Sequence, residues 1–114
     1  MKDHASLHVH SSWEPIFEPI SHQIEEVMQL LADQECAPPK ESIFAAFQVD
    51  CASIRCVIVG QDPYPTPGNA MGLAFSVNPH VSKIPPSLNN IFAELESDQG
   101  VSIPATGDLS PWMN

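Results

Sequence analysis

The sequence predicts an α/β fold, specifically part of a three-layer αβα arrangement in which helices flank a parallel sheet. The first observation is a run of mostly apolar residues at 54–59 with little polar alternation, which is typical of a strand covered on both faces. The second is that amphipathic helical patterns precede and follow this run. The third is size, because 114 residues that are 43 % hydrophobic allow one domain with a modest core.

The first expected helix covers residues 16–31, and either Ser12 or Ser21 could begin it. Its apolar residues recur at steps of three and four: Ile16, Ile20, Ile24, Val27, Met28 and Leu31. A shorter helix is expected at 39–47, after two prolines, because proline fits only the start of a helix. Three apolar residues share one face of this second helix: Ile43, Phe44 and Phe47.

The expected strand ends at Gly60, and the residues that follow it are candidates for a site. In α/β sheets, ligands bind beyond the carboxyl ends of strands, where this chain places Gln61, Asp62 and Tyr64. Prolines at positions 63, 65 and 67 fix the backbone torsions of the turn. A stiff turn around one aspartate suits a site whose groups must keep a productive geometry. A second, short strand is expected at 72–77.

The most regular helical pattern comes next, with Ser87 as the expected N-cap after Pro85 and Pro86. Its apolar stripe consists of Leu88, Ile91, Phe92 and Leu95. Ser110 followed by Pro111 predicts the opening of one more helix, but a helix of three or four residues has no stability of its own. A sheet also needs more strands than this sequence supplies. We therefore expect that C-terminal strands are missing.

Charge and cysteine content limit the function classes. The formal net charge is -10, with four Lys+Arg against fourteen Asp+Glu, which argues against strong non-specific binding to nucleic-acid backbones. The three cysteines form no CxxC pair and specify neither a disulfide framework nor a four-ligand zinc site. No apolar run approaches the ~20 residues of a membrane span, and the N-terminus has no signal-like apolar stretch. We expect a cytoplasmic protein that does not bind membranes.

Four blocks, in this order and spacing, resemble the N-terminal half of the family 1 uracil-DNA glycosylases: GQDPY (60–64), GLAFSV (72–77), PPSLNNIF (85–92) and GDLSPW (107–112). Two earlier segments, LHVHSSWEP and PPKESIFAAF, also look like the leading helices of that family. The resemblance therefore implies that residues 1–114 are the N-terminal portion of a single glycosylase domain. Pro65 departs from the pattern, because many members have histidine there. The family's later blocks, with an asparagine, a histidine and a wedging leucine, are absent.

The resemblance implies a DNA-repair hydrolase that flips uracil out of single- or double-stranded DNA and cleaves its N-glycosidic bond. It also implies a monomer without cofactor or metal. On this reading, Asp62 is the catalytic carboxylate that orients water and stabilises the cationic sugar. Gln61 would lie beneath the base, and backbone N–H groups of the Gln61–Asp62 stretch would reach a uracil oxygen. Tyr64 would stand against C5 of the base and reject thymine by collision with its methyl group.

The same resemblance implies a stacking and a phosphate-binding role further along the chain. Phe75 would stack on the flipped uracil, while Pro85, Pro86 and Ser87 would hold a DNA phosphate at a helix N-terminus. Each residue also has a plainer interpretation. Phe75 in an apolar run is by default a core residue, Ser87 is compatible with simple helix capping, and an Asp-Pro pair is commonly a turn.

Two other function classes compete with the enzyme. A fragment of this kind is expected to be inactive alone, and an acidic chain could instead be a non-catalytic binding protein or DNA mimic. A mimic has no need of a thymine-excluding tyrosine. Nucleotide binding after the strand is disfavoured, because the turn has neither a Walker lysine nor GxGxxG spacing. A metal site at His4, His8 and His10 is also disfavoured, because no further ligand is specified.

Overall fold

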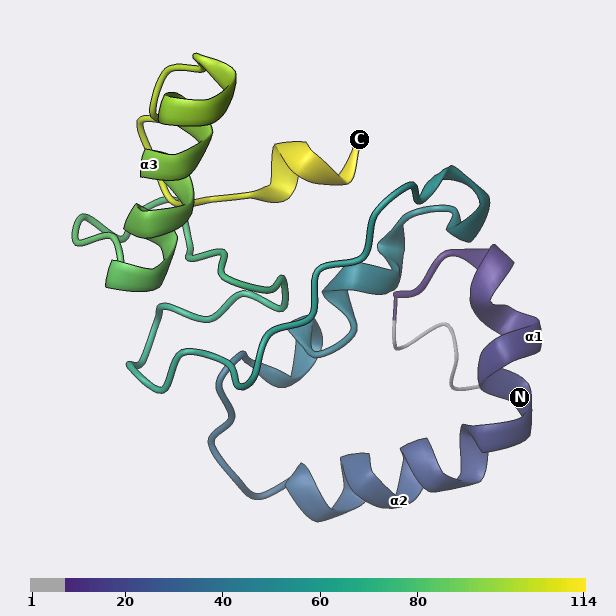
Figure 1. Cartoon of the computed structure of the whole chain (residues 1–114). Helices are drawn as coiled ribbons and strands as arrows, with labels where there is room; N and C mark the ends of the chain where they lie inside the picture. Colours follow the sequence, from purple (N-terminus) through teal and green to yellow (C-terminus); the bar gives the residue numbers. More distant parts are fainter. Residues whose placement is uncertain (1–7) are drawn as a thin grey trace.

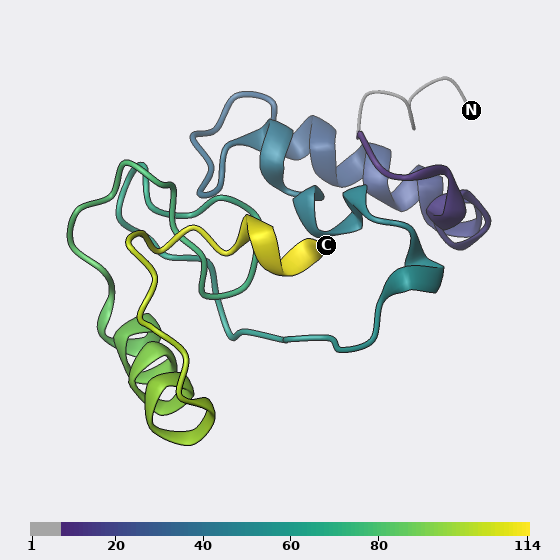
Figure 2. The ribbon, with the colours of Figure 1, turned by 90° about the horizontal axis from the view of Figure 1, so that it is seen from above.

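The computed structural model describes residues 8–114, which form two groups of helices joined by long loops (Figure 1). The elements in chain order are η2 (Ser11–Trp13), α1 (Glu14–Phe17), η3 (Glu18–Ile20), α2 (Ser21–Leu31), η4 (Lys40–Ser42), η5 (Ala45–Gln48), η6 (Cys51–Ser53), α3 (Pro86–Gln99) and η7 (Ser110–Met113), where η marks a 3-10 helix. Figures 1 and 2 show α3 on the opposite side of the loops from α1 and α2. The radius of gyration is 15.7 Å, whereas a compact domain of about 100 residues has about 13 Å.

The predicted helix at 16–31 is divided into three pieces. Glu18–Ile20 forms the 3-10 turn η3 with Pro19 in its first turn, because proline has no N–H to donate to a continuous α-helix. The longest piece, α2, begins at Ser21, one of the two predicted starts, although no side chain caps it. None of its residues is buried. Its apolar stripe is only partly covered: Ile24, Met28 and Leu31 are half-buried, whereas Val27 is 52 % exposed.

Aromatic side chains join the N-terminal helices to the segment that follows them. The ring of Phe47 lies 4.8 Å from that of Trp13 and 5.1 Å from that of Phe17, in edge-on arrangements, which favour aromatic pairs. The predicted single helix at 39–47 is wrong, because two 3-10 turns, η4 and η5, form instead. Phe44 and Phe47 have non-helical torsions while their rings pack edge-on against that of Phe17.

The predicted strand at 54–59 is extended at its start, and no segment of residues 8–114 pairs with it as a strand. Val57, Ile58 and Val59 are exposed to 73 %, 51 % and 83 %, so nothing in residues 8–114 covers both faces of this run. Within residues 8–114 no strand is assigned, and the expected strand at 72–77 is reduced to an antiparallel bridge between Ala70 and Val77. A strand needs a neighbour for its ladder of hydrogen bonds. The parallel sheet remains a prediction.

The buried core lies beside α3 and holds the motif loops in place. Val77, Leu88, Phe92 and Leu109 form it, each 4 % exposed or less. Burying side chains of this size contributes about 1.5–3 kcal/mol each. α3 begins with Pro86 after an N-cap at Pro85, so the prediction that Ser87 is the N-cap is wrong. The last predicted helix opening, at Ser110, forms as the 3-10 turn η7.

Candidate active site

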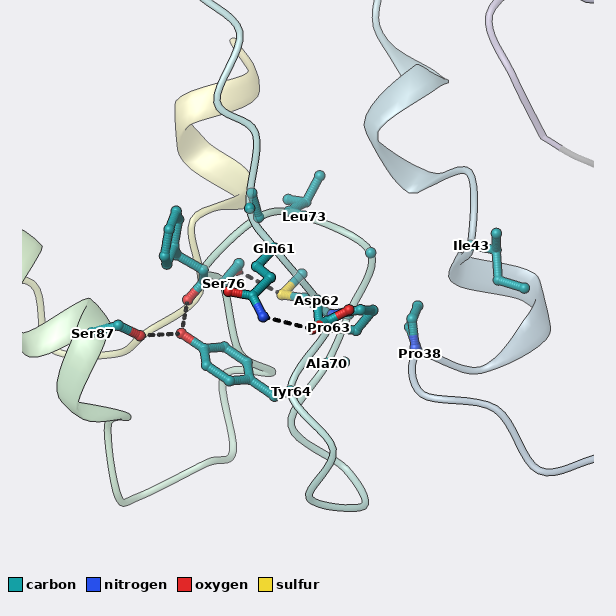
Figure 3. Close-up of a pocket in the computed structure, with 15 residues that line it drawn as sticks. Pro38, Ile43, Gln61, Asp62, Pro63, Tyr64, Ala70, Leu73, Ser76 and Ser87 are labelled. Carbon is teal, nitrogen blue, oxygen red and sulfur yellow. Dashed lines mark hydrogen bonds between the residues drawn. The ribbon is translucent and has the colours of Figure 1, made fainter.

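The motif loops line a half-open cavity of about 540 Å³, within the range of small-molecule sites. Three stretches line it, namely 60–64, 70–76 and Ser87, together with Pro38 and Ile43 from the N-terminal half. Figure 3 shows Tyr64 and Ser87 on one side and Pro38 and Ile43 on the other. Five of the residues that the sequence nominated lie around this one cavity: Gln61, Asp62, Tyr64, Phe75 and Ser87.

Asp62 presents an exposed carboxylate at this cavity. Its Oδ2 accepts a hydrogen bond from the Gln61 side-chain amide at 3.3 Å (Figure 3). An Asp carboxylate without a cationic partner can accept a proton or a water hydrogen bond, and it favours positive charge that develops nearby. The arrangement can therefore orient water at the mouth of the cavity.

Tyr64 is tied to two other cavity residues through its phenolic oxygen. The hydroxyl donates to the main-chain carbonyl oxygen of Phe75 at 2.8 Å and lies 3.4 Å from the Ser87 hydroxyl. Phe75 has a φ of 64°, in the left-handed region that costs non-glycine residues about 1–2 kcal/mol. Such torsions persist where the surrounding contacts determine them. Here the contacts at the carbonyl and around the ring of Phe75 set the position of that ring.

Ser76 is a structural residue of the site that sequence reasoning missed. Its side chain is buried, and its hydroxyl accepts from the Leu109 N–H at 2.8 Å and approaches the Met71 sulfur at 2.8 Å. The neighbouring Val77 N–H donates to the Gly107 carbonyl at 3.0 Å. These bonds join the block at 72–77 to the block at 107–112. The sequence carried one signal for this role, namely a single hydroxyl in an otherwise apolar run. If such a run is buried, its hydroxyl needs a hydrogen-bond partner.

A glycine brings the N-terminal half against the cavity. Gly72 has a φ of 94°, and a Cβ there would overlap the Ser42 carbonyl oxygen and lie 2.7 Å from the Ala45 Cβ. Pro38 and Ile43 reach the cavity from this same segment. The sequence nominated neither of them, because nothing in their local pattern indicates a site. Their place follows from the approach of two backbones at Gly72.

The three predicted phosphate-binding residues do not share one cavity. Ser87 lines the first, whereas Pro85 and Pro86 line a second cavity of about 530 Å³ between the turn at 65–69 and residues 80–86. Tyr64 lines both cavities and so forms a wall between them. The three consecutive residues thus line two neighbouring cavities, and their role in binding a phosphate stays a prediction.

The N-terminal histidines do not gather in the described part of the chain. His10 is engaged with Ser12, whose N–H donates to its Nδ1 at 3.1 Å, while His4 lies outside the described residues. From residue 8 onward, no cluster of three or more potential metal ligands is present. The helices in that range are also too short or too polar to cross a membrane.

No protein-family model matches the chain, but individual proteins do. The chain is 40 % identical to the uracil-DNA glycosylase of Corynebacterium glutamicum, in an alignment that covers 95 % of this chain and 53 % of that protein. It is 47 % identical to the enzyme of the same name from Corynebacterium efficiens, over 93 % of this chain and 47 % of that protein. It is 44 % identical to the uracil-DNA glycosylase of Thermobifida fusca, over 90 % of this chain and 47 % of that protein. The chain therefore spans about half the length of the curated relatives it matches.

Proposed function

Because the chain is homologous to uracil-DNA glycosylases over nearly its whole length, we propose that it supplies one half of such an enzyme. In this proposal it contributes a catalytic carboxylate and a pyrimidine-screening cavity to a hydrolase that removes uracil from DNA. The substrate is uracil-containing DNA, the setting is the cytoplasm, and the completed protein is a monomer. The single observation that supports it best is the shared cavity of Asp62, Tyr64 and Phe75.

The chemistry follows from the position of Asp62. Cleavage breaks the bond between the base nitrogen and C1′ of the sugar, and positive charge develops on the sugar as the base leaves with the electron pair. An ionised carboxylate stabilises that charge and orients a water, whose oxygen then bonds to C1′. The proton released by the water passes to the departing base or to the carboxylate. An exposed carboxylate at the mouth of the cavity suits this role because the sugar remains outside the base pocket.

The two rings account for the choice of base. A flipped base that enters the cavity meets Phe75, and stacking of this kind contributes about 1–3 kcal/mol per base. Tyr64 then stands where a thymine would carry its C5 methyl group, and a fixed ring excludes a methyl group by collision. Its hydrogen bond to Phe75 holds both residues in one relative position. The assignment of thymine exclusion to Tyr64 comes from the homology, and this hydrogen bond supports it because it fixes the ring.

The expected αβα fold is also a proposal. We place residues 54–59 as a strand of a parallel sheet in the completed domain, with partner strands from the half that the relatives carry in addition. Three exposed apolar side chains support this placement: Val57, Ile58 and Val59. Exposed apolar patches of a soluble chain commonly mark contact surfaces. We expect this chain to be inactive on its own because it matches only about half of each relative.

Complementation tests the proposed function. The chain is mixed with a polypeptide carrying the unmatched half of the Corynebacterium glutamicum relative, and uracil release from an oligonucleotide is measured. We expect release from the mixture, little from either half, and a loss of at least a hundredfold with Asp62→Asn, in line with a general base. The control is Asp98→Asn, which removes the same charge from an exposed position near the end of α3. Associated halves without activity, or full activity with Asp62→Asn, would refute the proposal.

A further inference from the structure

A methionine sulfur lies among the groups that line the candidate active site. Met71 lines the half-open cavity together with Asp62 and Phe75, and the residue is half-buried. Its thioether sulfur accepts a hydrogen bond from the Ser76 hydroxyl at 2.8 Å (Figure 3). Among the described methionines, at positions 28, 71 and 113, only Met71 has a sulfur that accepts a hydrogen bond. This sulfur is therefore both reachable from the cavity and part of the structure that supports it.

The Ser76 hydroxyl connects this sulfur to a second motif block. The same oxygen accepts from the Leu109 N–H at 2.8 Å and lies 3.4 Å from the Gly107 carbonyl oxygen. A hydroxyl has one proton to donate, and the closer of its two acceptors is the Met71 sulfur. Ser76 is only 1 % exposed, so solvent does not replace a partner that is lost. The position of the hydroxyl therefore depends on the state of the sulfur.

Oxidation changes this contact. A hydroperoxide oxidises a thioether when a sulfur lone pair attacks one peroxide oxygen. An S–O bond forms as the O–O bond breaks, and with hydrogen peroxide the departing hydroxide takes the proton of the transferred oxygen and leaves as water. Sulfur loses the two electrons that the peroxide gains, and a flexible apolar side chain becomes a polar sulfoxide. At 2.8 Å no oxygen atom fits between the Met71 sulfur and the Ser76 hydroxyl, so the sulfoxide must displace the hydroxyl or turn away from it.

We propose that Met71 is a site of oxidative modification by hydroperoxides, and that its sulfoxide separates the block at 72–77 from the block at 107–112. The displaced Ser76 hydroxyl no longer accepts from the Leu109 N–H. A buried donor without an acceptor destabilises the folded state. Oxidation at one cavity residue thereby loosens the contact between two segments that are more than thirty residues apart in the sequence.

The same displacement reaches the two rings of the candidate base pocket. Ser76 directly follows Phe75, whose carbonyl oxygen accepts the hydrogen bond from the Tyr64 hydroxyl. A shift of the backbone at Ser76 therefore changes the relative position of both rings. This consequence, a lower rate of uracil release after oxidation, rests on the proposed function. The effect of oxidation on folding does not.

Peroxide treatment of the intact chain tests this inference. The chain is incubated with hydrogen peroxide and then with dithiothreitol, which reduces disulfides and sulfenic acids formed by its three free cysteines but leaves sulfoxides intact. Peptide mass spectrometry measures the sulfoxide at each methionine. We expect sulfoxide at Met71 and a midpoint of thermal unfolding lower by about 4–8 °C, the shift that the net loss of one hydrogen bond causes in a small domain. A methionine sulfoxide reductase should restore the midpoint.

Three variants assign the effect to one sulfur. Met71→Leu removes the reactive atom and keeps an apolar side chain of similar volume, an exchange that protein cores tolerate, and its midpoint should not change with peroxide. Met28→Leu is the matched control in α2, outside the cavity, and should stay as sensitive to peroxide as the unsubstituted chain. Met71→Gln places a polar group of similar length at the site and should show the lower midpoint without peroxide.

The outcomes separate this inference from the proposed function. It is overturned if Met71 stays reduced while Met28 is oxidised, if the Met71 sulfoxide leaves the midpoint unchanged, or if Met71→Leu loses as much stability to peroxide as the unsubstituted chain. Uracil release that survives complete oxidation of Met71 in the complemented enzyme would overturn the consequence for the two rings. Absence of uracil release before any oxidation would refute the proposed function alone, because the unfolding measurement does not involve uracil.

Discussion

The hydroxyl of Tyr64 donates a 2.8 Å hydrogen bond to the main-chain carbonyl oxygen of Phe75. This bond links a ring in the turn after Gly60 to a residue with a left-handed backbone eleven positions later. It therefore couples the two rings that face the candidate base pocket. Substitutions that remove the Tyr64 hydroxyl alone, or the hydroxyl together with the ring, test what each part does.

Tyr64→Phe removes the hydroxyl and keeps the ring. We expect a loss of about 0.5–1.5 kcal/mol in the free energy of unfolding, the usual net worth of one hydrogen bond. In the complemented enzyme, rejection of thymine should persist with phenylalanine and fail with Tyr64→Ala, because collision requires the ring. Denaturant unfolding and thymine release from a thymine-containing oligonucleotide measure the two effects. Thymine release by the phenylalanine variant would contradict the assignment of exclusion to the ring.

Ser76→Ala removes the buried hydroxyl that joins two motif blocks. The Leu109 N–H then loses its acceptor, and an unsatisfied buried donor costs about 1–3 kcal/mol. Ser102→Ala is the control, because Ser102 is exposed and substitutions at such positions stay within about 0.5 kcal/mol. Equal unfolding free energies for the two variants would show that Ser76 does not join the blocks.

Gly72→Ala tests the close approach of the N-terminal half to the cavity. The added methyl group would overlap the Ser42 carbonyl oxygen, and the φ of 94° adds strain. Gly100→Ala is the matched control, with a φ of 66° and no atom within 4 Å of the new methyl group. We expect the control to cost about 1–2 kcal/mol, the penalty of the left-handed region alone, and Gly72→Ala to cost more. Thermal unfolding followed by circular dichroism compares them.

Val59→Asp tests whether residues 54–59 are an unpaired strand. Val59 is 83 % exposed, so the substitution should change the stability of the isolated chain by no more than about 0.5 kcal/mol. Complementation should fail, because a carboxylate buried in a sheet interior costs several kcal/mol. Val101→Asp, at a site 48 % exposed after the end of α3, should leave complementation intact. Undiminished uracil release with Val59→Asp would exclude the proposed strand.

The members of the site were predictable because they occur in contiguous blocks. Asp62 and Tyr64 lie in one turn, and Phe75 and Ser87 in two more blocks, and all four line the same cavity. The contributions of Pro38 and Ile43 were not predictable, and for Ser76 the only signal was one hydroxyl in an apolar run. They depend on which backbones come together, at Gly72 and at Gly107, and a local pattern carries no information about such distant neighbours.

The positions of α2 and α3 followed the apolar periodicity of the sequence, and the break before Ser21 followed from proline. The pattern at 39–47 did not predict its structure, because two 3-10 turns form there. The chain also determined by itself the stiff turn around Asp62, because proline torsions are local. Only the tertiary structure decided that Phe75 adopts a left-handed backbone and that the Ser76 hydroxyl meets the Met71 sulfur. Burial of residues 54–59 depends on partner strands, so no pattern within the run could settle it.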